Sequence, residues 1–378
     1  MDYKAFVQFV RELYNSEEFI PLHAPVFRGN EKKYLLETID STFVSSVGAY
    51  VNKFEDDIVN YTGAKYAIAV VNGTSALHMA LVLAGVKPGD LVITQALSFV
   101  ATANAISYTG ADPVFLDIDM QKMSLGRDAL SSFLEEIELV NGSPIHKPSG
   151  KKVSACVPMH TYGFPGEIDI ICDLCAKYNI PVVEDSAESI GSFYKGKHTG
   201  TFGKLGVFSF NGNKTITCGG GGIVVTDDES IAKLGKHLTT QAKTPHKWDF
   251  YHDHIGYNYR CPNLNAALAC AQLEQLEEIV ENKRATAESY RKYFEGSDIE
   301  FFTEPGQSRS NYWLNTIFLK DKTERDAFLT VTNENGVMTR PAWTLLNELP
   351  MFQGSLHDGL QNSRYLVDRL VNLPSSVR

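Results

Sequence analysis

The sequence predicts an α/β protein with a mostly parallel sheet flanked by helices. Between Tyr66 and Val225, short runs rich in β-branched residues alternate with helical stretches, which is typical of parallel strands joined by crossover helices. The chain of 378 residues is longer than one compact domain usually is, and its hydrophobic content of 43% is enough for a large core. Because the alternation fades after about residue 245, we predict an N-terminal segment and large domain over residues 1–245 and a smaller C-terminal α+β domain over residues 246–378.

The elements of this fold are expected in the following order. Residues 1–20 alternate charged and apolar positions, which predicts an amphipathic helix and lacks the apolar stretch of a signal peptide. Further helices are predicted at residues 76–84, 168–178 and 264–293, and an exposed loop at residues 141–152 (NGSPIHKPSGKK). Strands are predicted at residues 66–71, 91–94, 113–116, 153–157, 181–184, 206–210 and 222–225.

The composition narrows the class of protein. The net charge of −10 is spread along the chain without basic blocks, which argues against nucleic-acid binding, and no stretch approaches a membrane-spanning length. The six cysteines sit inside apolar segments, which suits a reducing cytoplasm. Cys172 and Cys175, the only close pair, fall within a predicted helix and are interpreted as buried helix cysteines, so no metal site is predicted. We expect a cytoplasmic protein without nucleic-acid or membrane partners.

Parallel sheets place ligands outside the carboxyl ends of their strands, so the residues after each strand are the candidates for chemistry. Gly73, Thr74 and Ser75 follow the first strand and open a helix, where free backbone N–H groups and the helix dipole attract a phosphate. Helix N-capping by the hydroxyls is the alternative interpretation. His160 follows the fourth strand, as a substrate contact or as an ordinary core histidine.

Asp185 follows the fifth strand, where an unpaired charge is costly. A protonated pyridine nitrogen would pair it and keep a cofactor ring electron-withdrawing, and helix capping is the alternative. Lys214 lies shortly before Gly219–Gly222, a run that suits a chain passing close to a ligand. A P-loop is excluded because the glycines follow the lysine. Composition alone does not separate Lys214 from nearby lysines; its spacing from Ser209 and Asp185 does.

Seven segments together resemble the DegT/DnrJ/EryC1/StrS family of sugar aminotransferases, which belongs to fold type I of the pyridoxal-phosphate enzymes. The resemblance covers nearly the whole chain, and the segments occur in the family's order. They are Phe43–Gly48 with Phe54 and Glu55, Asn72–Leu77, Gly89–Asp90, Phe99–Asn104, Glu184–Glu188, Ser209–Lys214 with Gly219–Gly222, and Gly256–Arg260.

The resemblance implies a role for individual residues. Lys214 would form the Schiff base with pyridoxal 5′-phosphate, and Asp185 would pair with the pyridine nitrogen. Phe99 falls where the family places a ring stacked on the cofactor, and Asn258 where it reaches the phosphate in the neighbouring subunit, which implies a homodimer with shared active sites. The phosphate would be held by Thr74, Ser75 and Ser209.

The same resemblance bears on the reaction. Some members carry histidine in place of the Schiff-base lysine and are dehydratases, so Lys214 favours transamination. The resemblance implies that Glu188 is a catalytic residue beside the cofactor's phenolic oxygen, as in the subset acting on 4-keto-6-deoxy hexoses, with a solvated helix carboxylate as the alternative. The nearest branch makes 4-amino-4,6-dideoxy-N-acetylglucosamine nucleotides for bacillosamine or legionaminic acid. Arg340 and Trp343 are candidate substrate contacts, with ordinary domain packing as the alternative. The segments that carry this finer match are Phe19–His23, Gly29–Tyr34, Pro158–His160 and Gly336–Pro341.

We therefore predict an aminotransferase that moves an amino group from glutamate, through pyridoxamine 5′-phosphate, to C4 of UDP-4-keto-6-deoxy-N-acetylglucosamine. Lys214 would shuttle the proton as general base and acid. A 3-keto-sugar aminotransferase, a dehydratase and a non-catalytic cofactor-binding regulator remain as alternatives. A dinucleotide-binding dehydrogenase is disfavoured because no Gly-x-Gly-x-x-Gly opens a helix after a strand.

Overall fold

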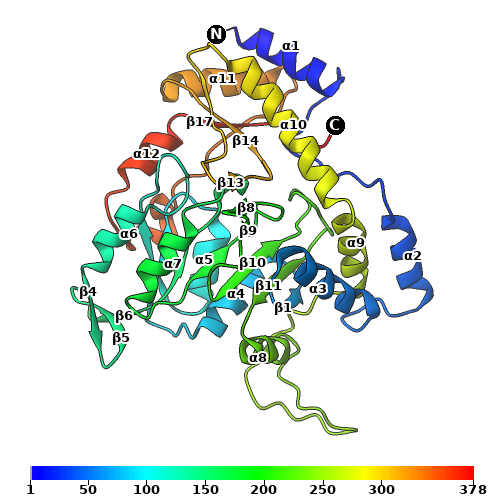
Figure 1. Cartoon of the computed structure of the whole chain (residues 1–378), viewed down its shortest axis with the longest axis vertical. Helices are drawn as coiled ribbons and strands as arrows, with labels where there is room; N and C mark the ends of the chain where they lie inside the picture. The colour runs from blue at the N-terminus through cyan, green and yellow to red at the C-terminus, as the bar shows by residue number, and fades with distance from the viewer. Residues whose placement is uncertain (1) are drawn as a thin grey trace.

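The computed structural model describes residues 2–378 and confirms the α/β fold (Figure 1). All seven predicted strands form, each within two residues of its expected bounds, because their β-branched runs suit a sheet that is covered on both faces. They are β1 (Tyr66–Val70), β2 (Leu91–Gln95), β3 (Asp112–Leu116), β6 (Lys151–Val157), β7 (Val183–Asp185), β10 (Leu205–Ser209) and β11 (Gly222–Thr226).

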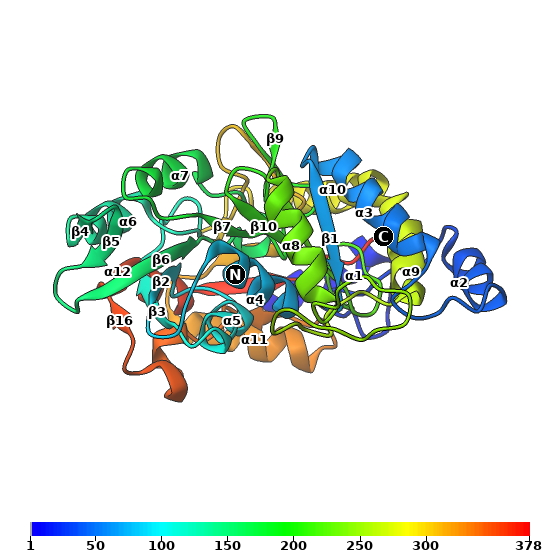
Figure 2. The same cartoon turned by 90° about the horizontal axis from the view of Figure 1, so that it is seen from below.

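The strands form one mixed, mostly parallel layer. The short strand β16 (Leu356–His357), β3, β2 and β6 pair in parallel, as do β7 and β10, while β11 lies between β10 and β1 and runs antiparallel to both. Parallel bridges from Cys156 to Val182 and from Met159 to Asp185 join the two sets. Figure 2 shows β3, β2, β6, β7, β10 and β1 following one another across the molecule.

Helices cover both faces of this layer, and alternate residues of each strand face opposite helices. On β1, Ile68 and Val70 pack towards one set of helices, and Ala67 and Ala69 towards the other. The first set is α4 (Gly73–Ala84), α5 (Val100–Tyr108) and α8 (Glu229–Thr239). The second is α3 (Ala49–Thr62), α9 (Asn263–Leu273) and α10 (Leu276–Phe294) near β1, with α6 (Arg127–Leu134) and α7 (Ile168–Ala176) near β2 and β3.

Two sequence predictions were wrong in detail. The predicted exposed loop at 141–152 contains strand β5 (Ser143–His146), which pairs with β4 (Ile137–Val140) and with the start of β6. Asn141 and Gly142 form the turn between β4 and β5 with φ of 51° and 79°, the positive values that a tight hairpin needs and that this residue pair accepts. The helical stretch 264–293 is broken into α9 and α10 around Glu274 and Gln275.

The C-terminal region contains a second sheet, ordered β12–β14–β17–β15, and the N-terminal helix packs on it. In α1 (Tyr3–Tyr14), Phe6 lies 5.0 Å from Phe328, centroid to centroid. After the helix, Ile20 forms a parallel bridge to Val337. Figure 1 shows α1 beside α11, far from the large sheet. The boundary at residue 245 stays a prediction, and we propose that residues 2–20 fold with the C-terminal region. The elements of the C-terminal region are β12 (Glu300–Phe301), β14 (Asn315–Phe318), α11 (Lys322–Glu334), β15 (Arg340–Pro341), α12 (Gln361–Val367) and β17 (Leu370–Leu373).

The remaining elements are short or peripheral. Cys172 and Cys175 lie on α7, in the predicted helix, with Cys175 buried and Cys172 partly buried. Across residues 2–378, each helix is too short or too polar to traverse a bilayer. The elements not yet named are α2 (Glu31–Asp40), β8 (Phe193–Tyr194), β9 (Lys197–His198), β13 (Ser308–Arg309) and the 3₁₀ turns η1 (Thr161–Gly163), η2 (Leu346–Glu348) and η3 (Pro350–Phe352).

Between α8 and α9 the chain leaves the body of the protein as a hairpin, residues 240–258, which we call the arm (Figures 1 and 2). Bridges between Thr240 and Asn258 and between Lys243 and His252 pair its two sides. Its outer part exposes large apolar side chains to a degree that is unusual for a monomer surface. The exposed fractions are 73% for Trp248, 81% for Phe250, 66% for Tyr251 and 86% for Ile255.

One glycine of the central sheet provides a test of the fold. A side chain on Gly206 of β10 would overlap the backbone of Gly200, including its carbonyl oxygen. Because backbone cannot yield as a flexible side chain can, we expect Gly206→Ala to lower the free energy of unfolding by about 3 kcal/mol. Gly354→Ala is the matched control, since nothing lies within 4 Å of its new methyl group. Urea unfolding of both variants checks this, and equal stabilities would contradict the strand packing.

Candidate active site

A cavity with about 870 Å³ of free space, part of it open to solvent, lies at the carboxyl ends of β7 and β10 and beside the start of α4. It brings together most of the residues predicted for the site: Gly73, Thr74, Phe99, Asp185, Glu188, Ser209, Lys214 and Trp343. The lining residues that sequence reasoning had not singled out for a role include Met159, Asn211, Asn213 and Trp313.

One end of the cavity is formed by the first turn of α4. Asn72 caps the helix, with its side-chain oxygen accepting the N–H of Ser75 at 2.8 Å, so the hydroxyl of Ser75 is not the cap. A side chain on Gly73 would stand 2.7 Å from the Cβ of Ser209, so glycine is what allows the end of β10 to approach this turn. Backbone N–H groups of a first helical turn have no acceptor within their own helix. This end can therefore hold a phosphate.

The glycine run Gly219–Gly222 has another purpose than the predicted passage past a ligand. None of the four glycines lines the cavity. A side chain on Gly222 would overlap the carbonyl oxygen of Asn72 and stand 2.9 Å from the nitrogen of Gly73. Gly222 thus lets β11 pass close to the chain that leads from β1 into α4, and it shapes the phosphate end indirectly.

Asp185 lies at the base of the cavity, 2% exposed. Its Oδ2 accepts the hydroxyl of Thr102 at 2.7 Å and its Oδ1 accepts the N–H of Ala187 at 3.2 Å. Burial raises the pKa of Asp185, and these hydrogen bonds and the charge of Lys214 oppose that effect. Thr102 was missed as a partner although it lies in the Phe99–Asn104 segment, because only the tertiary structure brings it to Asp185.

Lys214 reaches the cavity from the loop after β10, with its side chain 11% exposed. Its Nζ lies 3.1 Å from Oε1 of Glu188 and 4.2 Å from the ring centroid of Trp313. The indole N–H of Trp313 donates to the carbonyl oxygen of Asn213 at 2.7 Å, which ties the ring to the loop that carries Lys214. The amine is therefore held between a carboxylate and an aromatic face.

The side chain of Glu188 is buried, with only 1% of its surface exposed. Its Oε2 accepts the N–H of Tyr162 at 2.8 Å. Burial raises the pKa of Glu188 to about 7, and Lys214 lessens the rise. The carboxyl therefore changes charge near neutral pH.

This pKa predicts a pH-dependent stability of the cofactor-free protein. Below pH 4.5 Glu188 is protonated in both states, but between 4.5 and about 7 only the folded state retains the proton. Stability is therefore lost as pH rises through this window, by about 3 kcal/mol for this group. We expect Glu188→Gln to reduce the stability difference between pH 5 and pH 8 by about this amount, measured by urea unfolding. The exposed Glu17→Gln should leave it unchanged; equal pH profiles for wild type and Glu188→Gln would refute the assignment.

The mouth of the cavity is aromatic. Phe99 is 47% exposed and meets Trp343 edge to face at 6.0 Å between centroids, and Trp343 in turn lies 4.8 Å from Tyr162. An exposed phenyl ring at a cavity mouth offers a flat surface for stacking. Trp343 thus lies at the mouth of the cavity, from a segment remote in sequence.

Four predicted residues do not line the cavity, and one of them is Ser75, whose backbone N–H is bound to the side chain of Asn72. His160 is fully buried, with one ring nitrogen 3.1 Å from Glu184 and the other accepting the N–H of Gly166, which fits the core-histidine interpretation. Arg340 is exposed and donates to Asn333 at 2.9 Å. Asn258 is exposed at the base of the arm and does not line the cavity of its own chain.

The residues present fit pyridoxal 5′-phosphate. The cavity offers a phosphate-binding helix start at one end, the buried carboxylate of Asp185 for a protonated pyridine nitrogen at the base, and the amine of Lys214 between them. Without a cation, burial of the Asp185 carboxylate is costly, and a pyridinium would offset that cost. Together with the α/β fold, these features define a pyridoxal-phosphate enzyme of fold type I.

The chain belongs to the DegT/DnrJ/EryC1/StrS aminotransferase family, whose sequence pattern matches residues 25–378. It is 37% identical over 335 residues to a GDP-perosamine synthase of Escherichia coli O157:H7, covering 89% of this chain and 87% of that protein. It is 36% identical over 359 residues to a GDP-perosamine synthase of Vibrio cholerae, covering 94% of each. The aminotransferase TlmJ of Streptoalloteichus hindustanus superposes with a TM-score of 0.86 at 26% identity, covering 94% of this chain and 93% of that chain.

These comparisons confirm the family, the fold and the cofactor predicted from the sequence. They do not confirm the branch that serves bacillosamine or legionaminic acid, because both of these relatives carry the name of a GDP-linked sugar.

Proposed function

We propose that the protein transfers an amino group from glutamate to C4 of a nucleotide-linked 4-keto-6-deoxy sugar. The observation that carries this proposal is the position of Lys214, whose amine points into a cavity that holds a buried aspartate and a helix start. Bound pyridoxal 5′-phosphate supplies an electron sink for carbanion charge. A lysine at this position favours transamination over dehydration.

The residues of the chain would divide the work as follows. Gly73, Thr74 and Ser209 bind the phosphate and so fix the orientation of the ring, while Asp185 keeps the pyridine nitrogen protonated. Lys214 carries a proton between the reacting carbons as base and then acid, and Glu188, 3.1 Å away, balances its charge. Binding energy from the nucleotide, remote from the reacting carbon, would orient the sugar.

The nucleotide has two candidates. The sequence resemblance favours UDP-4-keto-6-deoxy-N-acetylglucosamine, and the names of the relatives favour a GDP-linked sugar. The relatives give the UDP-linked sugar no support. The exposed aromatic mouth formed by Phe99 and Trp343 suits either a nucleobase or a sugar ring, so it does not distinguish the two nucleotides. Identification of the product does.

The deciding experiment offers the cofactor-loaded enzyme UDP-, GDP- and dTDP-linked 4-keto-6-deoxy sugars, with glutamate as donor. The product is identified by mass spectrometry and NMR. An amine at C4 with one of these nucleotides supports the proposal and names the sugar. An amine at C3, a product that has lost water, or bound cofactor without any product would refute it in favour of a 3-keto-sugar aminotransferase, a dehydratase or a regulator.

We further propose that the enzyme is a homodimer in which each arm completes the partner's site. Asn258 lies outside the cavity of its own chain, and the arm that carries it exposes apolar side chains such as Phe250 and Ile255. In a dimer, each chain would cover the apolar side chains of the other's arm, and the Asn258 on that arm would reach the phosphate end of the covering chain's cavity.

Complementation tests this arrangement. Lys214→Ala and Asn258→Ala chains, each impaired alone, are co-expressed with different tags and the mixed species is purified. A shared site predicts that activity returns in the mixed dimer, because the cavity with Lys214 then receives Asn258 from the other chain. Activity no greater than the sum of the two parents would contradict it.

A further inference from the structure

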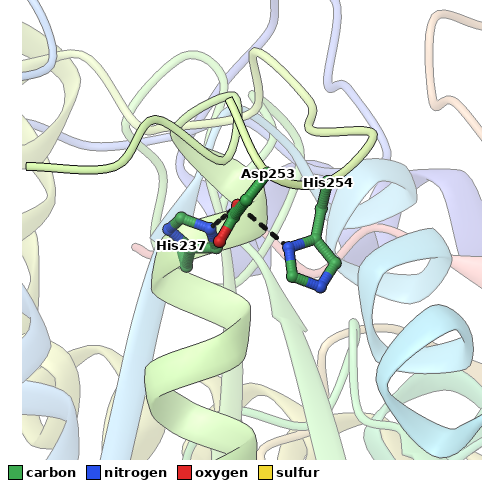
Figure 3. A group of neighbouring side chains, drawn as sticks. All are labelled: His237, Asp253 and His254. Atoms are coloured by element: carbon green, nitrogen blue, oxygen red, sulfur yellow. Dashed lines mark hydrogen bonds and ion pairs between the residues drawn. The ribbon is translucent and has the colours of Figure 1, made fainter. Parts of the chain in front are cut away.

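Three side chains with metal-binding atoms meet at the base of the arm, outside the cavity (Figure 3). His237 extends from the last turn of α8, and Asp253 and His254 lie on the returning side of the arm. Nε2 of His237 lies 2.6 Å and Nδ1 of His254 lies 2.9 Å from the same carboxylate oxygen of Asp253. The three donor atoms all lie within 4.8 Å of one another.

We propose that this cluster binds a divalent transition-metal ion of the zinc class. Two imidazoles and a carboxylate are the ligand types that such ions prefer, and three protein ligands leave a fourth position for water or for a group from another chain. Around a tetrahedral zinc ion with ligands at about 2.0–2.1 Å, neighbouring donor atoms stand roughly 3.3 Å apart. The two distances in the structure are shorter by several tenths of an ångström, so the carboxylate must withdraw slightly from both rings.

The surroundings allow this movement. The side chains of His254 and Asp253 are 55% and 39% exposed, so no packed core opposes it, and an ion has a path of entry. The site also adjoins the carboxyl end of α8, an eleven-residue helix, where the helix dipole favours a cation.

The neighbouring histidines provide contrast. His252 has its Nδ1 on the carbonyl oxygen of Gln241 at 2.8 Å, and His246 lies beside Asp249 near the tip of the arm. Neither belongs to the cluster. A metal at the cluster would link the returning side of the arm to α8. The backbone N–H of Asp253 itself donates to the carbonyl oxygen of Ala242, on the outgoing side of the arm, at 3.3 Å.

Cobalt titration of the untagged, cofactor-loaded enzyme tests the site. Co²⁺ should bind with one ion per chain and give visible d–d absorption, which Zn²⁺ should remove by competition. Removal of a ligand should weaken binding by more than about tenfold, because loss of a second-shell partner alone costs that much. We therefore expect His237→Ala and His254→Ala to lose the absorption and His246→Ala to retain it.

Absence of Co²⁺ binding would overturn the proposal, and so would absorption that survives in both His237→Ala and His254→Ala. Loss in His246→Ala to the same extent would place the ion elsewhere on the arm and would also overturn it. Hydrogen exchange gives a second reading. Zn²⁺ should slow exchange of the amides in residues 240–258 in the wild type and not in His254→Ala, and equal exchange in both would refute the link between the arm and α8.

Discussion

We expect replacement of Lys214 by alanine to abolish turnover and the visible absorbance of lysine-bound cofactor together. Lys214 is the lysine whose amine lies in the cavity, 3.1 Å from Glu188 and against the ring of Trp313. Loss of both nucleophile and proton carrier should lower kcat by at least about 10⁴-fold. Stopped assays of amine transfer and an absorbance spectrum of the purified protein measure the two effects.

The control for this variant is Lys204→Ala. Lys204 is an exposed lysine that directly precedes β10, so its loss changes the charge of the protein equally without touching the cavity. It should keep both spectrum and activity. Since Lys214 is not a core residue, circular dichroism and thermal unfolding should show that the Lys214→Ala chain still folds. Retention of the absorbance band in Lys214→Ala would refute the site.

Asp185→Asn is the second substitution with a large expected effect. Asparagine has nearly the same shape and keeps an oxygen for Thr102 or Ala187, but it cannot hold a proton on a pyridine nitrogen by charge. Removing one electrostatic stabiliser of developing charge typically costs about 10²–10³-fold in kcat, and we expect a loss of this size. Steady-state kinetics at saturating cofactor separate this loss from weaker cofactor binding.

The same substitution should not lower the free energy of unfolding of the cofactor-free protein. Burial raises the pKa of Asp185, so the charged carboxylate is disfavoured in the cofactor-free protein and a neutral amide should be tolerated. We expect Asp185→Asn without cofactor to unfold at no lower a denaturant concentration than the wild type. Thr102→Val, which removes only the hydrogen bond to the carboxylate, should give a smaller loss of kcat. Full activity in Asp185→Asn would contradict the proposed role.

Much of the large sheet could be predicted because its strands are short β-branched runs, buried on both faces, and therefore visible without tertiary information. The hairpin of β4 and β5 was missed for a local reason. Its two strands are only four residues long each, and the Asn141–Gly142 turn signal was interpreted as loop. The break between α9 and α10 was missed because the apolar pattern continues across Glu274 and Gln275.

For the site, the sequence by itself determined the family, the cofactor and the residues at strand ends, because motif order and the carboxyl ends of parallel strands are properties of the chain. Only the tertiary structure decided which of those side chains meet. In the structure Trp313 contacts the amine of Lys214, Thr102 donates to Asp185, and the side chain of His160 lies in the core. The structure also assembled His237 with Asp253 and His254. Such contacts join segments up to about a hundred residues apart, as in the bond from Trp313 to Asn213, and no local pattern records which partner packing will bring near.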